Sequence, residues 1–580
     1  MKNRRIIITL ALGFLLQWGC TDLQEERLDE AEFGGQAEVI SGAIAPAYGY
    51  ISQVWRHTNY YGLQLLPSDE AILPYRGGED WFDGGKFIAT HQHSFTPTND
   101  LIGDGWNQVT TNISRTLSAI EVLKPLAEEG DTEAGAALSE MIALRAYLNM
   151  LMLDSWGLVL KKETSSELSQ VIRGQEAIDY IQSELLSVVD VINTNRAPGR
   201  ITQAAVWGFL ARLHLNAAVY RDPYGTPSFT QEDMNAVIQY SDNIINSGDF
   251  ELSSEYFELF NDNNNSNPEL IFALDQRGQL KEEHSRWAYW SVSGDMFPRP
   301  EYPSADGTDG PALTPDFYQT WVDAYGTIDP AEADARFFQE NAMVPEELKD
   351  LTGLSPLNDQ DHYYCVVSTE FDMDRGIIRG IPWGPRKAED GTFFTCDGGV
   401  RIYPLQLRTG NSPARDVGYI DHTLEIDFST EGSYHNTGYR CAKYEFSRTS
   451  NNGNHFSSVD LVLMRLGEIY LMRAEAKLRN GDSAGALTDV NFLRASRTAR
   501  PEQTPPALET LNLDNLLRER GFELYWEGFR RGDQIRFGTY EDSWTEKIDS
   551  DINKRLFPIP QSVVDAASGI EGFLVQNQGY

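Results

Sequence analysis

The stretch LMRLGEIYLMRAEAKLRNGDSAGALTDVNFLRASR, residues 463–497, says most about how this 580-residue chain folds. Its apolar residues recur at spacings of three and four, which predicts two helices separated by Gly481 and Asp482. Leu463 to Tyr470 reads L-x-x-L-G-x-x-Y and fits the opening of a tetratricopeptide repeat, with leucine in the tryptophan slot. The second helix, Ser483 to Arg497, begins later than the roughly 34-residue template places it, so we predict an unusually long first helix. The stretch is therefore either a degenerate repeat or an ordinary helical hairpin.

The same periodicity dominates the first half of the chain. Short turn-rich breaks at 157–174 and 193–199 allow successive helices to fold back on one another. This pattern predicts an array of helical hairpins, with helices at Ala37 to Trp55, Trp106 to Leu126, Ala136 to Trp156, Gln175 to Ile192, Gln203 to Tyr220 and Glu232 to Ile245.

From Asp249 to His455 the helical pattern gives way to aromatic segments punctuated by glycine and proline, such as MFPRP at 296–300 and IPWGP at 381–385. Loops on a rigid scaffold can present side chains that a packed helix must bury. We therefore expect this irregular part to carry the binding function.

The N-terminus has the pattern of an export signal. Lys2, Arg4 and Arg5 precede an apolar run from Ile6 to Leu16, which is too short to span a bilayer stably and is followed by polar and acidic residues. Cys20 after Gly19 resembles a bacterial lipobox, in which the cysteine thiol receives diacylglycerol, although Gln17 and Trp18 depart from that pattern. The alternative is a secreted protein in which Cys20 is incidental.

Composition and motifs disfavour several classes of function. The formal net charge of −38 would repel nucleic acid phosphates and anionic membrane surfaces. Cys365, Cys396 and Cys441 have no CxxC spacing, so a metal site is disfavoured; one disulfide with one thiol left over is possible, and the pairing stays open. The chain has no HExxH, GxSxG or phosphate-loop motif. His91 and His93 lack a third ligand, so we predict a surface pair and no metal.

Ordered blocks along the chain carry a family resemblance. In the C-terminal third these are MRLGEIYLMRAEAK at 464–477, then RERGFELYWEGFRRGDQIRFG at 518–538, LFPIPQ at 556–561 and QNQGY at 576–580. Weaker matches precede them in the right order, among them PSDEA at 67–71 and NPELIF at 267–272. The chain thus resembles the SusD/RagB family, and departs from it at Phe529 and Gln534, where histidine and leucine are frequent.

The resemblance implies a fold and a cellular role. It implies an all-α fold, in which tetratricopeptide-like hairpins form a right-handed superhelical scaffold with long irregular loop insertions. It divides the chain into a signal peptide at 1–19, an N-terminal helical region at 20–248, a loop-rich ligand-binding region at 249–455 and a C-terminal helical region at 456–580, packed as one unit. It also implies an outer-membrane lipoprotein that delivers a glycan to a SusC-like TonB-dependent transporter, with no catalytic residues and no cofactor.

Two aromatic clusters are candidates for the glycan site. Sugars present flat C–H faces ringed by hydroxyls, so a capture site needs exposed aromatic planes beside polar side chains. The first cluster is Tyr75, Arg76, Trp81 and Phe82, with Glu79, Asp80 and Asp83 as further polar groups. The second is Trp287, Tyr289 and Trp290, and Trp383 is a further candidate. Tryptophans on helical patterns, namely Trp106, Trp156, Trp207 and Trp526, are predicted to lie in the core, and the charged residues between Arg518 and Arg536 to form structural ion pairs.

Two other functions remain open at this point. A peptide-capturing relative, as some RagB-like proteins are, would show the same sequence features. A surface glycoside hydrolase is disfavoured by the missing motifs, and with 86 acidic residues some suitably spaced carboxylate pair will occur by chance.

Overall fold

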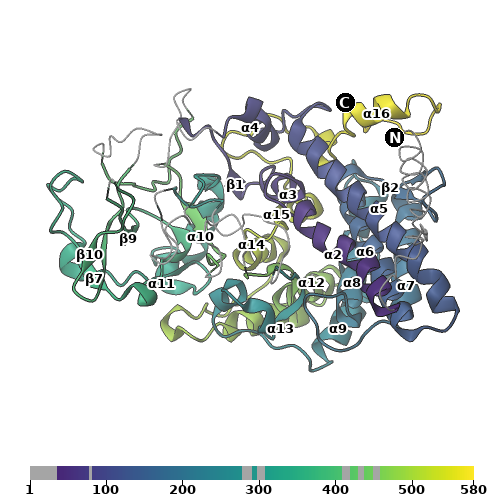
Figure 1. Cartoon of the computed structure of the whole chain (residues 1–580), viewed down its shortest axis with the longest axis horizontal. Helices are drawn as coiled ribbons and strands as arrows, with labels where there is room; N and C mark the ends of the chain where they lie inside the picture. The colour runs from purple at the N-terminus through teal and green to yellow at the C-terminus, as the bar shows by residue number, and fades with distance from the viewer. Residues whose placement is uncertain are drawn as a thin grey trace, which may run out of the picture.

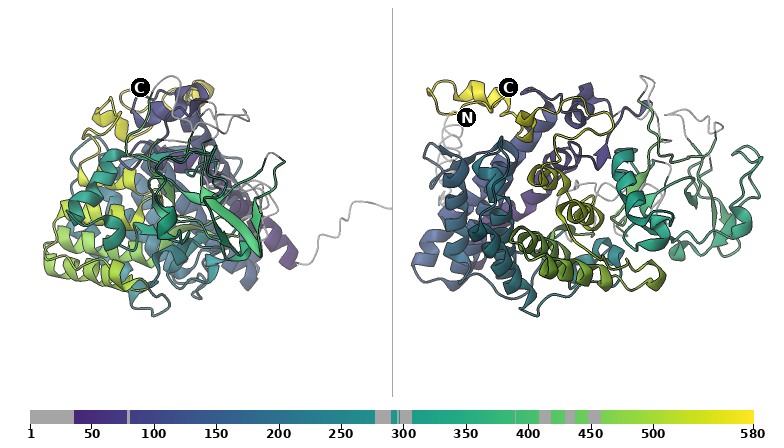
Figure 2. Two further views of the ribbon diagram at one scale, coloured as in Figure 1. Left: turned by 90° about the vertical axis from the view of Figure 1, so that its left-hand side faces the viewer. Right: turned by 180° about the vertical axis from the view of Figure 1, so that it is seen from behind.

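The computed structural model describes residues 36–77, 81–276, 290–294, 296, 307–388, 390–407, 418–428, 437–447 and 458–580. Within them, long helices gather at one end of the molecule and short strands and loops at the other (Figure 1, Figure 2). The fold is all-α in class and built on tetratricopeptide-like hairpins, as predicted, although short strands occur in the loop-rich part.

The N-terminal helices form the predicted hairpin array. Side chains of Asn99, Asp131 and Thr230 accept hydrogen bonds from backbone N–H groups of the first turns of α5, α6 and α9, which fixes where these helices begin. The elements are α2 (Gln36–Val54), α3 (Tyr60–Leu65), α4 (Lys86–His91), α5 (Asp100–Glu128), α6 (Thr132–Trp156), α7 (Gly174–Val188), α8 (Gln203–Arg221) and α9 (Gln231–Ile245), with the hairpin β2 (Val159–Lys161) and β3 (Gln170–Ile172) between α6 and α7.

The helical array continues in the C-terminal part. Helix α12 packs against α8 and α9, although more than 200 residues separate α9 from α12 in sequence. The elements are β13 (Leu461–Arg465), α12 (Leu466–Arg479), α13 (Ser483–Ser496), α14 (Leu513–Leu524), α15 (Arg530–Phe537) and α16 (Gln561–Ala567), with 3-10 turns at Pro501–Gln503 and Ile552–Arg555. The prediction of an unusually long first helix is wrong, because Leu463 to Arg465 belong to strand β13 and α12 has 14 residues.

The loop-rich part is an insertion in the helical array. Strand β4 (Leu270–Leu274) pairs antiparallel with β13, so the insertion begins and ends at neighbouring positions. Its other elements are β5 (Ala312–Leu313), α10 (Pro315–Tyr325), α11 (Pro330–Ala333), β6 (Phe338–Gln339), β7 (Tyr364–Val366), β8 (Arg375–Ile378), β9 (Trp383–Pro385), β10 (Thr395–Cys396), β11 (Gly399–Pro404) and β12 (Arg440–Ala442), with 3-10 turns at Tyr256–Phe260, Asn264–Ser266, Glu346–Leu348 and Ser368–Glu370.

These strands form small separate sheets. One sheet has the strand order β10-β11-β7, and β9 also pairs with β11. Another sheet has the order β12-β8-β6. Strand β5 pairs with β1 (Ala71–Ile72), which ties the N-terminal part to the loop-rich part. The main core cluster includes Trp156, Tyr256, Trp321 and Met464, and so takes residues from all three predicted regions; the boundaries of those regions stay a prediction.

A buried ion-pair network joins the start of the insertion to the C-terminal helices. Arg465 and Arg497 each bind both Glu269 and Glu523, with the Arg465 contacts at 2.8 and 2.7 Å. Arg336 binds Glu523 as well, at 3.0 Å. All five side chains are at most 1% exposed. Arg520 and Arg536 pair with Asp533, so the predicted structural ion pairs of 518–536 are present.

Helix α6 is long and apolar enough to cross a membrane, but 83% of its apolar window is buried inside the protein, so it is the central core helix. Trp106, Trp156 and Trp526 are buried as predicted, whereas Trp207 is only partly buried. The prediction of a surface histidine pair is wrong. His91 and His93 are buried, and their rings bond backbone carbonyls, Nε2 of His91 with Thr545 and Nε2 of His93 with Pro67.

Candidate functional site

The first aromatic cluster lies where loops from three parts of the chain meet. The segment after β1, which carries Tyr75 and Arg76, contacts the segments 307–311 and 437–440, and Trp81 reaches Thr308 and Trp290. Part of the second cluster therefore joins the first, since the rings of Trp81 and Trp290 are 6.4 Å apart.

Arg76 holds this junction together. Its Nε and Nη2 donate to the carbonyl of Gly310 at 3.2 and 3.0 Å, and its Nη1 donates to the carbonyl of Thr437 at 3.0 Å. The side chain is fully buried, and burial together with the nearby Arg440 lowers its pKa well below the usual range, against the opposing effect of Asp309. In this structure Arg76 is therefore an internal anchor of the loops and presents no group to a ligand at the surface.

Trp81 is anchored as well, but keeps part of its ring accessible. Its Nε1 donates to the carbonyl of Thr308 at 2.6 Å, and its ring packs edge-on against Phe87 at 5.7 Å. The residue has a positive φ of 63°, an unfavourable conformation for a bulky side chain that the surrounding contacts maintain. The geometry fixes the orientation of the indole.

Trp290 is a core residue. It is fully buried between His57, Tyr61 and Trp81, so its ring offers no face to a ligand in this structure. Gly310 packs directly on it: Gly310 N donates to the Trp290 carbonyl at 2.7 Å, and a Cβ at Gly310 would come within 2.2 Å of that oxygen. Only glycine fits there, and sequence analysis did not identify its role.

Phe82 and the partly exposed Tyr75 form the most accessible part of the cluster. Their rings meet edge-to-face at 5.9 Å, and Phe82 is 53% exposed. Gly84 and Gly85, with φ of 68° and 82°, turn the chain directly after Phe82 into α4. This turn keeps the Phe82 ring outside the core, where a large apolar side chain is unusual.

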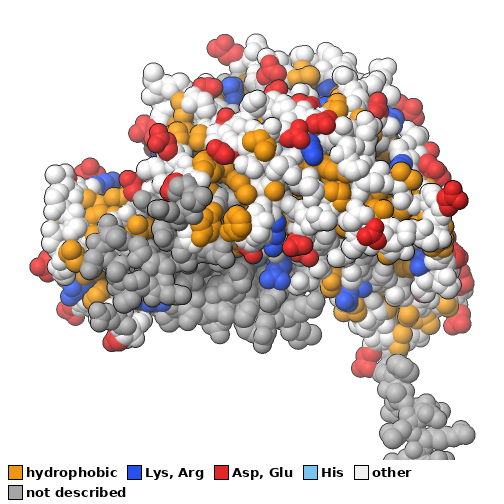
Figure 3. All heavy atoms as spheres, turned by 90° about the horizontal axis from the view of Figure 1, so that it is seen from above, with side chains coloured by type: hydrophobic (Ala, Val, Ile, Leu, Met, Phe, Trp, Pro, Cys, Tyr) orange, Lys and Arg blue, Asp and Glu red, His pale blue; other side chains and the backbone are white. Residues whose placement is uncertain are grey.

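Polar side chains follow these rings in the chain, and the Lys86 Nζ lies 4.9 Å from the ring centroid of Phe87, which packs on Trp81. Asp83 is exposed, while Lys86 and Asp104 are half-buried. Burial raises the pKa of Asp104, and Lys86 and Arg56 partly offset that rise, so the three side chains lie within electrostatic reach of one another. The site thus combines accessible ring planes with donors and acceptors. On the face shown in Figure 3, hydrophobic side chains likewise lie among acidic and basic ones.

Of the remaining predicted residues, most lie outside the part of the chain that the structure describes, and Trp383 lies elsewhere. Glu79, Asp80, Trp287 and Tyr289 lie outside the described residues, as does Cys20. Trp383 is 9% exposed and packs with Ile402 and Val400 in a separate small core under the β7–β11 sheet. Cys365 pairs with Cys396, which settles the open pairing, and Cys441 is a buried free thiol.

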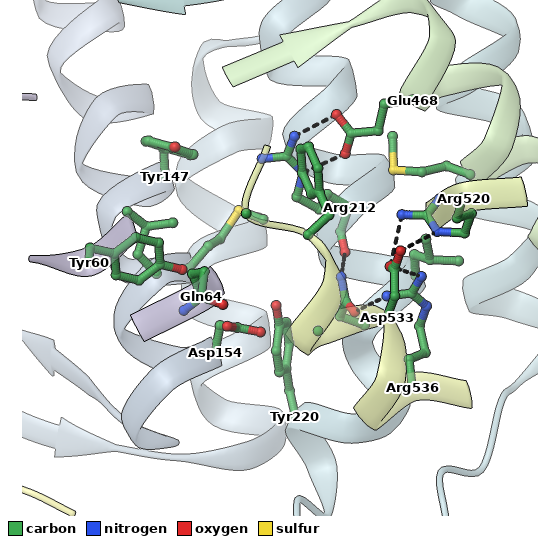
Figure 4. Close-up of a pocket in the computed structure, with 18 of the residues that line it drawn as sticks. Tyr60, Gln64, Tyr147, Asp154, Arg212, Tyr220, Glu468, Arg520, Asp533 and Arg536 are labelled. Carbon is green, nitrogen blue, oxygen red and sulfur yellow. Dashed lines mark hydrogen bonds and ion pairs between the residues drawn. The ribbon is translucent and has the colours of Figure 1, made fainter. Parts of the chain in front are cut away.

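A cavity of about 70 Å³ lies within the helical scaffold (Figure 4). Tyr60, Gln64, Asp154 and Tyr220 surround it, and ion pairs of Arg212 with Glu468 and of Arg520 with Asp533 close one side. It has room for roughly five water molecules and none for a sugar chain. The cavity belongs to the packing of the scaffold. Among the described residues, no three His, Cys, Asp or Glu side chains are grouped as metal ligands would be.

Known proteins of one family are similar to this chain. Residues 425–580 match the model of the SusD family. The chain is 25% identical over 469 residues to the starch-binding protein SusD of Bacteroides thetaiotaomicron, covering 78% of this chain and 74% of the relative. The C-terminal part of the chain thus matches the SusD family, and most of the chain is similar to a protein of that family. A SusD-like protein of Bacteroides ovatus is 23% identical over 288 residues, which are 47% of this chain and 50% of that one.

Solved structures of SusD-like proteins have the same fold. Surface glycan-binding protein A from Bacteroides thetaiotaomicron, in complex with laminarihexaose, aligns with a TM-score of 0.63 at 17% identity and covers 93% of this chain and 99% of that one. A laminarin-binding SusD-like protein aligns with a TM-score of 0.60 at 16% identity, over 94% and 99% of the two chains.

Proposed function

We propose that this protein is a non-catalytic glycan-binding protein of the cell surface, which captures oligo- or polysaccharide and passes it to a SusC-like TonB-dependent transporter. The observation that carries the proposal is the exposed Phe82 ring in contact with the partly exposed Tyr75, close in sequence to an anchored and partly accessible Trp81. Accessible aromatic rings, with Lys86 near Trp81 through Phe87, match the alternating apolar and hydroxyl faces of a sugar. SusD of B. thetaiotaomicron, a family member, is a starch-binding protein.

The test is affinity electrophoresis of the chain lacking residues 1–20. The gels should contain starch, laminarin and a set of neutral and anionic polysaccharides, and retardation by one class identifies the ligand. We expect Tyr75→Ala with Phe82→Ala to abolish the retardation, because truncating the anchoring rings of a site costs roughly 2 kcal/mol or more.

The matched control is Phe492→Ala on α13, since Phe492 is also a strongly exposed phenylalanine, at 56%. It should leave the retardation unchanged. Retardation that survives the Tyr75 and Phe82 changes would remove this pair from the site. Failure of the unaltered protein to respond to any polysaccharide would favour the peptide-capturing alternative, which binding to an oligopeptide library would then establish.

The membrane anchor is a separate part of the proposal. The basic and apolar N-terminus ending at Cys20 supports lipidation, and acyl chains on one cysteine would hold the domain at the outer membrane. Cys20→Ala should release the protein from the membrane fraction of producing cells. Membrane association that persists in this variant would contradict lipidation at Cys20.

A further inference from the structure

The small sheet of β7, β9, β10 and β11 has two chemically different faces. Val400 lies opposite Val366, and Ile402 lies opposite Tyr364, so these four side chains share one face. That face is the buried one, since Val400 and Ile402 are at most 2% exposed and pack on Trp383. Side chains alternate along a strand, so the intervening residues point to the other face.

The outer face carries a group of rings around one arginine. Arg401 lies opposite Cys365, and its guanidinium sits 4.3 Å from the ring centroid of Tyr363. Tyr403 lies two residues along β11, and its ring contacts the ring of Tyr363 at 5.4 Å and that of Phe394 at 5.9 Å. The neighbouring Phe393 packs into the inner core, which shows that the chain turns Phe394 outward.

This outer face is held rigid. The disulfide between Cys365 and Cys396 joins β7 to β10, the strands that adjoin Tyr363 and Phe394. Below it, Arg386 stacks on Tyr403 at 4.7 Å and makes a two-pronged ion pair with the buried Asp359 at 3.0 and 2.7 Å. A rigid set of rings loses little conformational entropy when it binds a ligand.

The exposed groups fit a sugar better than a protein partner. Phe394 is 41% exposed, Tyr363 and Arg401 are partly exposed, and Tyr403 is buried beneath them, so the open apolar area is small. A stable protein interface needs roughly 1,000 Å² or more of buried surface. Arg401 uses Nε on the carbonyl of Thr395 and Nη1 on the Tyr403 hydroxyl, and its Nη2 makes no hydrogen bond to the described residues. A ring plane beside a free donor is what a hydroxylated sugar ring requires.

We propose that Phe394, Tyr363 and Arg401 form a second glycan contact on this face, separate from the Tyr75–Phe82 site. The proposal rests on the proposed function, because it assumes that the first site also binds the glycan. The β7–β11 sheet lies at the far end of the loop-rich part, away from α4, which follows the first site (Figure 1). A long chain can touch both places at once, whereas a short oligosaccharide occupies one, so the second contact adds avidity for polymers alone.

The test compares ligand lengths on one protein. Binding of a hexasaccharide and of the parent polysaccharide is measured for the chain lacking residues 1–20 and for its Phe394→Ala/Tyr363→Ala variant. We expect the variant to bind the polysaccharide at least about five-fold more weakly and the hexasaccharide as the unaltered protein does. Phe492→Ala is again the matched control, and Phe394→Tyr, which keeps the ring plane, should retain full polymer binding.

Each outcome is decisive. Unchanged polymer binding in the double variant overturns the second contact and leaves the proposed function intact. Equal weakening for both lengths also overturns it, because the sheet would then belong to one continuous site. If Phe394→Tyr lost as much affinity for the polysaccharide as the double variant does, ring stacking would be excluded. Failure of the unaltered protein to bind any glycan is the failure of the proposed function itself. Circular dichroism and titration of free thiols verify that each variant is folded with its disulfide formed.

Discussion

Arginines are used differently in the helical scaffold and in the loop-rich part. In the scaffold Arg465 and Arg497 both bind Glu269 and Glu523. Against the effect of burial, carboxylates raise the pKa of both guanidinium groups, with Glu527 the largest contributor for Arg465 and Glu269 for Arg497. In the loop-rich part, burial lowers the pKa of Arg375 and Arg440, that of Arg440 to about 10. Arg375 donates to the carbonyls of Ala442 and Lys443, and Arg440 to that of Gly310.

The difference follows from the backbone. A helix satisfies most of its own carbonyls, so an arginine buried among helices is neutralised mainly by carboxylates. An irregular segment leaves carbonyls without partners, and a guanidinium fork can satisfy several of them at once. Buried ion pairs also occur in the loop-rich part, as between Arg386 and Asp359, but Arg76 and Arg440 at the candidate site bind backbone carbonyls and so fix the shape of the loops.

The largest loss of stability is expected from a change in the scaffold. Glu523→Ala leaves Arg336, Arg465 and Arg497 buried with a shared carboxylate missing. Loss of one member of a buried ionic network costs roughly 3–5 kcal/mol, because the remaining charges stay desolvated. Urea unfolding at neutral pH measures the change. Glu346→Ala, which removes the exposed partner of Lys349, is the control and should leave stability unaltered. A loss below about 1 kcal/mol for Glu523→Ala would show that the network contributes little.

A second prediction concerns pH and the junction between the two parts. Glu70 is buried, and desolvation raises its pKa to about 8 although it accepts a hydrogen bond from Trp526 N at 2.6 Å. The folded state holds the Glu70 proton more tightly than the unfolded state does. This difference stabilises the fold in full below the unfolded-state pKa of about 4.5, and the stabilisation is lost as the pH rises toward about 8. Glu70→Gln should remove this decline, on the order of a few kcal/mol between pH 5 and 8.

The measurement is the free energy of unfolding from urea titrations of both proteins at several pH values. The difference between the two curves isolates Glu70, since all other titrating groups are common to both. Parallel curves from pH 5 to 8 would mean that Glu70 is ionised in the folded protein.

The smallest effect on stability is expected from the loops. Arg76→Met removes the donors to the carbonyls of Gly310 and Thr437, and it keeps an apolar side chain of similar length. Because the change leaves the apolar packing in place and removes only hydrogen bonds to carbonyls, we expect a global loss of only about 1–2 kcal/mol. Hydrogen exchange should accelerate at 307–311 and 437–440, and glycan affinity should fall with it. Unchanged exchange in both segments would contradict the anchoring role, and a global loss as large as that of Glu523→Ala would erase the distinction between the two parts.

Much of the scaffold was predictable from local sequence. The helices from α5 to α9 begin and end within a few residues of the predicted ranges in most cases, because each repeats apolar residues at helical spacing. Strand β13 was missed, since Leu461 to Arg465 reads as the start of the following helix and only pairing with β4, nearly 190 residues earlier, makes it a strand. His91 and His93 were misplaced for a related reason: the backbone carbonyls that bury them come from 66–71 and 545.

The sequence by itself determined the helical hairpins, the SusD-like motifs of the C-terminal part and the aromatic residues near 75–82, since these depend on residues close together in the chain. Only the tertiary structure decided which aromatic rings face solvent. Trp290 and Phe82 are equally apolar in sequence, yet one is buried against Gly310 and the other is left outside by the turn at Gly84 and Gly85. The Cys365–Cys396 pairing and the outer ring group around Arg401 were likewise settled by strand register. Burial depends on which distant segments cover a side chain, and no local pattern contains that information.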